Sequence, residues 1–225
     1  MFDIGLATHR RGFIGRLAAG AAALGFSGLA APLAAETPRG RESVDPSVDA
    51  WLNKITGKHK QVFDAPAPHD GLPFAWARVF QMTNAETGAA PADVSAVIVL
   101  RHAGIAFAMN DAMWAKYKFG EMFSVNDPAT KAPSLRNFLT HTKPGETLLP
   151  GMAVDELLAA GALIGVCNVA LTVYAGGAAK AMNMDATAVK AEWVANLVPG
   201  IQVLPSGVWG VNRTQEHGCT YCFAG

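Results

Sequence analysis

Cys167 is the residue of this chain that is best placed for chemistry. It follows the apolar run Ala162–Val166 and immediately precedes a stretch that is predicted to be helical. A thiol at the start of a helix faces backbone N–H groups without partners and the positive end of the helix dipole, and both favour the thiolate. A thiolate is the nucleophile in sulfur transfer and disulfide exchange. The sequence therefore predicts a reactive thiol at Cys167, and the alternative is a small buried residue at a strand end.

Other candidate residues also stand at the ends of predicted strands. His102 follows one buried apolar run, and Ser206 and Gly207 follow another. His102 has the chemistry of a general base or a ligand, and the alternative is a hydrogen bond within a loop. Together with Cys167 it is a candidate catalytic residue. Asn168, Ser206 and Gly207 are candidate ligand-binding residues, because ligands of parallel α/β sheets bind beyond the carboxyl edge where the strand order reverses.

The remaining cysteines, Cys219 and Cys222, form a C-x-x-C pattern. No histidine follows it, so it is not a site of c-type haem attachment. If this segment is a strand, positions three apart point to opposite faces and cannot easily bridge. A turn at the same place would permit a disulfide between Cys219 and Cys222. The sequence leaves both alternatives open.

No motif in the sequence identifies a cofactor. It contains neither a glycine-rich phosphate loop nor a dinucleotide fingerprint after a strand. It also has no serine in a nucleophile elbow and no pair of histidines at zinc spacing. Nucleotide binding is therefore not supported, no metal ligands are assigned, and the cofactor is unknown.

Alternating strands and helices must position these side chains. Apolar runs, β-branched in the second case, predict strands at 61–65, 94–100, 162–166, 201–204 and 219–223. Apolar periodicity and capping residues predict helices at 72–83, 110–123, 154–160, 168–182, 185–197 and 206–217. This order favours right-handed crossovers and a mostly parallel, doubly wound sheet.

The first 35 residues resemble a twin-arginine export signal. Arg10 and Arg11 are followed by one small and two apolar residues, and residues 17–35 carry no charge and are rich in Ala, Gly and Leu. We expect cleavage after Ala35, export to the periplasm by the twin-arginine machinery, and membrane contact only through the uncleaved signal. The alternative is a transmembrane helix, for which the glycines and the proline of this stretch make a poor anchor.

Composition and length indicate one globular domain after the signal. The chain has 225 residues, 51% of them hydrophobic, with 18 basic and 18 acidic side chains. This balance, without basic runs, excludes an electrostatic binder of nucleic acid.

We divide the chain into a signal at 1–35, a flexible leader at 36–58 and an α/β domain at 59–225. A short piece around Trp51 is expected to dock on the domain. Residues 125–150 form a loop insertion, and loops of that length are often lids or interfaces.

Two stretches resemble the DsrE/DsrF superfamily of small sulfur-relay proteins. The first is Leu163–Leu171 and the second is Val198–Val208 with its continuation to Tyr221, within a resemblance that covers roughly residues 90 to 223. The resemblance implies a flavodoxin-like three-layer α/β sandwich, often assembled into homo-oligomers. In sulfur-transferring members of the family a cysteine after the corresponding strand carries a persulfide, and Cys167 matches that position.

Three functions follow as hypotheses. The first, which we favour, is an exported sulfur carrier or sulfurtransferase-related protein that uses Cys167. His102 or the helix that begins at Ser206 would assist it, and its partner would be a protein that donates or accepts sulfur. The second is a non-enzymatic periplasmic binding module for a small ligand, a metal or haem, with His102, Cys167 and Met109 as candidate ligands. The third is a subunit of a periplasmic complex, with residues 125–150 as its interface.

Overall fold

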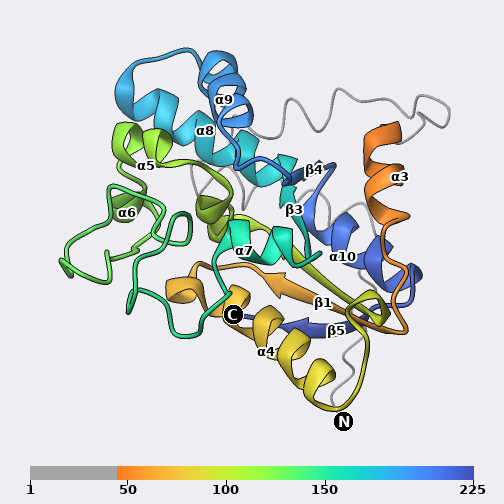
Figure 1. Cartoon of the computed structure of the whole chain (residues 1–225). Coiled ribbons are helices and arrows are strands. Elements are labelled where there is room, and N and C mark those ends of the chain that lie inside the picture. The colour runs from red at the N-terminus through yellow and green to blue at the C-terminus, as the bar shows by residue number, and fades with distance from the viewer. Residues whose placement is uncertain (1–44) are drawn as a thin grey trace, which may run out of the picture. The chain divides into compact units, whose positions relative to one another are not determined.

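An entirely parallel sheet lies at the centre of residues 45–225, the part of the chain that the computed structural model describes. Its strands are β1 (His59–Ala65), β2 (Val94–Leu100), β3 (Leu163–Cys167), β4 (Gln202–Leu204) and β5 (Thr220–Phe223). Their order is β4-β3-β2-β1-β5 (Figure 1). The predicted α/β class with a parallel sheet is therefore confirmed. The predicted signal, with Arg10, Arg11 and the cleavage after Ala35, lies outside the described residues.

Burial on both faces explains why β2 is an unbroken apolar run. β1 pairs with one edge of β2 and β3 pairs with the other. Ile98 and Leu100 pack into one hydrophobic cluster, whereas Val97 and Val99 pack into a second cluster on the opposite face. All four side chains are at most 1% exposed. A strand in this position has no polar face, so β-branched residues suit it.

Helices cover the two faces of the sheet in separate layers. From β1 to β4 the chain moves along the sheet in one direction, and right-handed crossovers place the connecting helices on one face. The return from β4 to β5 runs the other way and places its helix on the opposite face. The first layer holds α4 (Leu72–Glu86), α7 (Val154–Ala159), α8 (Asn168–Met182) and α9 (Ala186–Ala195), and the second holds α3 (Pro46–Leu52) and α10 (Gly207–Glu216). The result is the predicted three-layer sandwich (Figure 1).

The strand order differs from the flavodoxin order 2-1-3-4-5 in the strand beside β1. In this chain β5 takes that edge position. Within residues 45–225, no helix combines the length and the apolar character needed to cross a bilayer.

The segment before β1 contributes a helix to the sandwich. The side chain of Asp45 caps α3 by accepting a hydrogen bond from the backbone N–H of Ser47. Trp51 and Leu52 are 4% and 3% exposed and belong to the same hydrophobic cluster as Leu204. The piece around Trp51 therefore docks on the domain as predicted. Residues 46–52, which the sequence assigns to a flexible leader, form part of the second helix layer.

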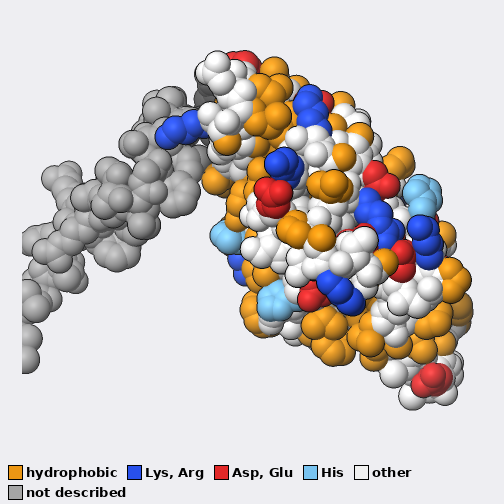
Figure 2. All heavy atoms as spheres, turned by 90° about the vertical axis from the view of Figure 1, so that its left-hand side faces the viewer, with side chains coloured by type: hydrophobic (Ala, Val, Ile, Leu, Met, Phe, Trp, Pro, Cys, Tyr) orange, Lys and Arg blue, Asp and Glu red, His pale blue; other side chains and the backbone are white. Residues whose placement is uncertain are grey.

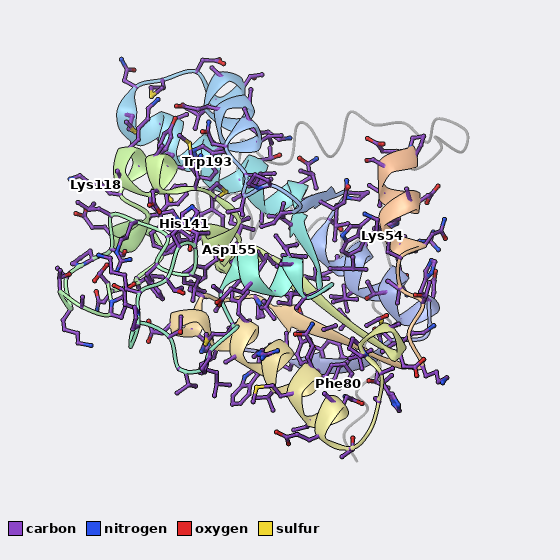
Figure 3. The ribbon with its side chains drawn as sticks, in the orientation of Figure 1. Lys54, Phe80, Lys118, His141, Asp155 and Trp193 are labelled. Carbon is purple, nitrogen blue, oxygen red and sulfur yellow. The ribbon has the colours of Figure 1, made fainter. Side chains whose placement is uncertain are left out.

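The single helix predicted at 110–123 is wrong, because two helices occupy this stretch. They are α5 (Asp111–Tyr117) and α6 (Phe119–Met122). Asn110 caps α5 by accepting from the N–H of Met113. Lys118 has a φ of 51°, in the left-handed region, and this conformation ends α5 (Figure 3). A lysine does not mark such a break as a glycine would.

Short 3₁₀ helices that the sequence did not reveal occur within residues 45–225. They are η1 (His69–Gly71), η2 (Pro91–Asp93) and η3 (His102–Ala108). η1 follows β1, and η3 follows β2 after one residue. Both therefore lie at the carboxyl ends of their strands.

Aromatic side chains join α5 and α6 to α9. The ring of Trp193 is fully buried, with its centroid 4.9 Å from that of Phe119 and 5.4 Å from that of Tyr117 (Figure 3). On the outside of this contact, Lys116 and the Tyr117 hydroxyl both donate hydrogen bonds to Glu192. Because α9 packs closely on α8, these contacts support the helix that begins after Cys167.

Residues 125–150 lie between α6 and α7, and Arg136 holds this loop together. Its guanidinium donates to Asp127 at 2.7 Å and to both carboxylate oxygens of Glu146. The hydrogen bond from Arg136 holds the pKa of Glu146 below its ordinary value. The side of the molecule that carries α6 shows charged side chains of both signs scattered among hydrophobic ones (Figure 2).

We predict that the substitution Gly165→Ala lowers the free energy of unfolding by about 1 to 3 kcal/mol, because it overpacks the second layer. A β-carbon at Gly165 would lie 2.4 Å from Cδ1 of Leu204 and 3.3 Å from Cη2 of Trp51. Gly177→Ala is the matched control, because a β-carbon there meets nothing within 4 Å. It should raise the free energy of unfolding by about 0.5 to 1 kcal/mol. Urea unfolding followed by circular dichroism measures both, and equal stabilities of the two variants would contradict the close packing of Leu204 and Trp51 over Gly165.

Candidate functional site

The carboxyl ends of the parallel strands meet at one edge of the sheet, and the chain leaves this edge toward both faces. β3 leads into α8 in the first layer, whereas β4 leads into α10 in the second layer. Cys167 of β3 pairs in register with Leu204 of β4. The carboxyl ends of β3 and β4 therefore form the topological switch point, which is where α/β sheets bind ligands. Cys167, Asn168, Ser206 and Gly207 lie at this edge.

Cys167 ends β3 and is also the N-cap residue of α8. Its Sγ accepts a hydrogen bond from the backbone N–H of Ala170 at 3.3 Å, as a serine or aspartate oxygen does at other helix starts. The residue is 6% exposed. The backbone N–H groups at the start of α8 and the positive end of its dipole therefore face this sulfur. The arrangement suits a nucleophilic sulfur with narrow access to solvent.

The predicted ligand-binding residues occupy the starts of two helices. Asn168 is the first residue of α8, and Ser206 is the N-cap residue of α10. The Oγ of Ser206 accepts a hydrogen bond from the N–H of Trp209 at 3.2 Å, so this side chain has a structural task. Gly207 lies against Arg101, whose Cβ would be 2.4 Å from a β-carbon at position 207. Because Gly207 has no side chain, α10 can begin directly against the end of β2.

His102 lies on the neighbouring strand end and contacts α8 through Tyr174. Both of its ring nitrogens are 3.4 Å from the Tyr174 hydroxyl, and the two rings meet edge to face. Burial raises the pKa of Tyr174, so its hydroxyl stays protonated and can donate to the imidazole. Within residues 45–225, no hydrogen bond joins His102 to Cys167. The two candidate catalytic residues therefore share an edge of the sheet without direct contact in this structure.

Cys219 and Cys222 are free thiols, and the disulfide that the sequence left open is not formed. Cys219 belongs to the hydrophobic cluster of the α3 and α10 layer, whereas Cys222 packs against the cluster of the opposite layer. A strand sends positions three apart to opposite faces, which separates the two sulfurs. Burial raises the pKa of Cys219 to about 11 and also raises the pKa of Cys222.

The structure contains an ionic cluster near Cys167 that the sequence did not predict. Asp64 of β1 is only 3% exposed. It accepts hydrogen bonds from Nε and Nη2 of Arg101 at 2.6 and 2.8 Å, and from the hydroxyl of Tyr221 at 2.8 Å. The hydrogen bond with Asp64 is the main cause that raises the pKa of Arg101. Burial, and then the bond to Asp64, raises the pKa of Tyr221. We refer to these three residues as the Asp64 cluster.

Two sequence signals could have revealed the Asp64 cluster. Asp64 interrupts the otherwise apolar end of β1, and Arg101 directly follows the buried strand β2. A charge in a buried strand needs a partner of opposite sign, because an unpaired buried charge is very costly. β1 and β2 are consecutive strands, so each of these charges is the natural partner of the other. Tyr221 has no such local signal.

The residues of the binding-module hypothesis do not form an evident ligand set. Met109 is fully buried in the core of the first layer. Its carbonyl accepts a hydrogen bond from the side chain of Asn137. Within the described part of the chain, no group of three or more His, Cys, Asp or Glu side chains is arranged to hold a metal ion.

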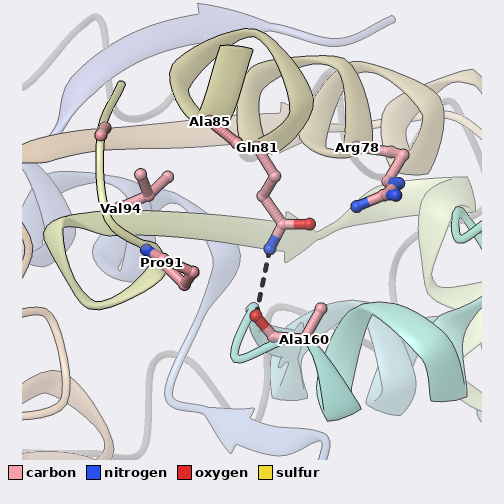
Figure 4. Close-up of a pocket in the computed structure, with 7 residues that line it drawn as sticks. Arg78, Gln81, Ala85, Pro91, Val94 and Ala160 are labelled. Carbon is pink, nitrogen blue, oxygen red and sulfur yellow. Dashed lines mark hydrogen bonds between the residues drawn. The ribbon is translucent and has the colours of Figure 1, made fainter. Parts of the chain in front are cut away.

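A hollow of about 320 Å³ lies at the other end of the sheet from Cys167 (Figure 4). It is lined by Arg78, Gln81, Ala85, Ala89, Pro91, Val94 and Ala160. Val94 is the first residue of β2, so the hollow faces the amino ends of the strands. Gln81 crosses it and donates to the carbonyl of Ala160 at 3.5 Å. The hollow and Cys167 therefore lie at opposite ends of the sheet.

No family model matches the sequence, and no curated protein matches it. Among solved structures, the chain is similar to a protein of unknown function, MTH1491, from Methanobacterium thermoautotrophicum. The two chains are 16% identical, and the match covers 73% of this chain and 98% of that one with a TM-score of 0.39.

We predict that Cys219 in the folded protein reacts with iodoacetamide at pH 8 about 100-fold more slowly than in the unfolded chain. Burial disfavours the charged thiolate, so the pKa of about 11 leaves Cys219 protonated until the pH rises well above 9. Peptide mass spectrometry after timed alkylation, with and without urea, measures the ratio. Equal rates in the two conditions would show that Cys219 is not buried.

Proposed function

We propose that this chain is an exported sulfur carrier of the DsrE type and that Cys167 carries the sulfur as a persulfide. The observation that carries the proposal is the place of the Cys167 sulfur. It lies at the switch-point edge of the sheet and accepts a hydrogen bond at the start of α8. The three-layer sandwich with a parallel sheet supports it too, because it agrees with the fold that the family resemblance implies.

The proposed transfer needs only the thiolate and a sulfur donor. The Cys167 thiolate attacks the outer sulfur of a donor persulfide, R–S–SH, and forms a new S–S bond. The S–S bond of the donor breaks, and the donor leaves as the thiolate R–S⁻. An acceptor thiolate then takes the outer sulfur from Cys167 by the same reaction. The N–H groups at the start of α8 stabilise the negative charge that Cys167 carries before attack and after donation.

The other two thiols of the described chain are less suited to this reaction. The raised pKa of Cys219 keeps it protonated at neutral pH, and it is buried beneath the second helix layer. Cys222 also has a raised pKa, again because of burial. Neither of them lies at a helix start. The proposal therefore singles out Cys167.

We predict that incubation of the protein with a persulfide donor adds one sulfur, about 32 mass units, to Cys167. The variant Cys167→Ser should gain no sulfur, and Cys222→Ser should gain it at the normal rate as the matched control. Intact-mass spectrometry with peptide mapping locates the adduct. A wild-type protein without adduct, or an equal adduct on Cys167→Ser, would refute the proposal. A bound small molecule in the native mass, without sulfur transfer, would favour the binding module instead.

Export by the twin-arginine route is part of the same proposal, supported by Arg10 and Arg11 and the uncharged stretch after them. We predict that replacement of both residues by lysine keeps the precursor in the cytoplasm. The charge is unchanged by this substitution, so only recognition of the arginine pair is lost. Cell fractionation and N-terminal sequencing measure the outcome, with Glu36 expected as the first mature residue. Unchanged export of the double variant would refute this route.

A further inference from the structure

We infer that Arg101 selects the sulfur donor by binding an anionic group attached to the sulfur that Cys167 accepts. This inference rests on the proposed role of Cys167 and adds the chemical class of the donor. The class is a sulfane sulfur joined to an oxyanion, and thiosulfate is its simplest member. Four elements bring the necessary groups together: the ends of β1, β2 and β3 and the start of α10.

Strand register places Arg101 beside Cys167. Leu100 of β2 lies opposite Val166 of β3, so the next residues along the two strands, Arg101 and Cys167, are neighbours at the carboxyl edge. Adjacent parallel strands are about 4.8 Å apart. The Cys167 side chain packs against the first-layer cluster at the start of α8, whereas the Arg101 side chain lies against the start of α10. After the larger effects of Asp64, burial and Tyr221, the charge of Cys167 also contributes to the raised pKa of Arg101.

The Asp64 cluster fixes the orientation of the guanidinium. Two parallel hydrogen bonds, from Nε and Nη2 of Arg101, clamp it to a carboxylate that is itself 3% exposed. Tyr221 holds the same carboxylate from β5. The aliphatic part of Arg101 lies over Gly207, where any side chain would displace it. Arg101 is therefore held in place before any ligand arrives, which lowers the entropy lost on binding.

Arg101 retains hydrogen-bond donors for a ligand. A guanidinium has five N–H donors, and the clamp to Asp64 uses one on Nε and one on Nη2. Within residues 45–225, no acceptor is bonded to Nη1, and the Arg101 side chain is 29% exposed. The oxygens of a sulfonate match such a fork of donors. α10 begins at Gly207, directly beside Arg101, so its dipole adds to the attraction for an anion.

The reaction with thiosulfate balances without a further reagent. The Cys167 thiolate attacks the outer sulfur of thiosulfate and forms the Cys167 persulfide anion. The S–S bond of thiosulfate breaks, and sulfite leaves with the electron pair of that bond and two negative charges. Arg101 binds the sulfonate oxygens in the starting anion and in the departing sulfite, where the negative charge grows. A donor without an oxyanion gains nothing from this contact.

The test compares two donors on the full chain. We expect Arg101→Gln to slow persulfide formation from thiosulfate roughly 10- to 100-fold. Its rate with the uncharged persulfide of 2-mercaptoethanol should change by less than about twofold. Because Arg101→Gln leaves Asp64 unpaired, the double variant Arg101→Gln with Asp64→Asn repeats the measurement without a buried lone charge. Arg78→Gln, at the opposite end of the sheet, is the matched control and should react with both donors as wild type does. Equal losses with both donors, or no loss with thiosulfate, would overturn the inference.

A binding measurement separates this inference from the proposed function. Inorganic sulfate carries the oxyanion but no sulfur that can be transferred. It should slow the alkylation of Cys167 by iodoacetamide in the wild type and leave Arg101→Gln unaffected. If neither donor modifies the wild type, the proposed sulfur transfer is wrong. Protection of Cys167 by sulfate still shows in that case whether Arg101 binds an anion. Protection that is equal in both proteins, or absent from both, would show that Arg101 does not bind the anion.

Discussion

Burial of a parallel sheet on both faces is the constraint from which most of this structure follows. β2 has no polar face, so helices must cover it above and below. The chain builds the first layer while it steps from β1 to β4, and only a return crossover can build the rest of the second layer. That return makes α10 leave β4 toward the face opposite α8. The divergence of these two helices creates the switch point at which Cys167 and Ser206 lie.

The same burial explains why Asp64 occurs together with Arg101 and Tyr221. A carboxylate that is 3% exposed is stable only with partners that replace its water. Arg101 supplies two hydrogen bonds and Tyr221 supplies a third. Such a cluster adds little net stability compared with well-packed apolar residues. Its effect is to hold the Arg101 guanidinium in one orientation at the carboxyl edge of the sheet, whereas a flexible surface arginine would take many orientations.

Local patterns in the sequence were sufficient for the strands, for most of the helices and for the caps. Asn110, Asp185 and Ser206 each accept the capping hydrogen bond that their side chains predict. The position of Cys167 before a helix was equally predictable from the sequence, because an apolar strand ends there. The break between α5 and α6 at Lys118 could not be predicted. A lysine has no preference for the left-handed backbone conformation that it adopts there, so the surrounding packing imposes it.

The strand order and the contacts across it had no local signal. Asp64 meets Arg101 across 37 positions of the chain and meets Tyr221 across 157 positions. These contacts exist only because β1 lies between β2 and β5. Periodicity reports which face of a strand is buried and does not report which strand lies beside it. The cluster that orients Arg101 therefore became visible only in three dimensions.

The pairing of β1 with β5 has a consequence for the order in which the molecule is completed. The ladder joins Gln61–Asp64 to Thr220–Phe223, so one edge of β1 has no neighbour in the growing chain until these late residues leave the ribosome. Contacts between such distant segments form slowly, because a long loop must close first. The nascent protein therefore presents an open strand edge and a half-formed Asp64 cluster until β5 has emerged. An unpaired edge of this kind is a site for wrong pairing with other chains, so correct assembly depends on how quickly β5 arrives.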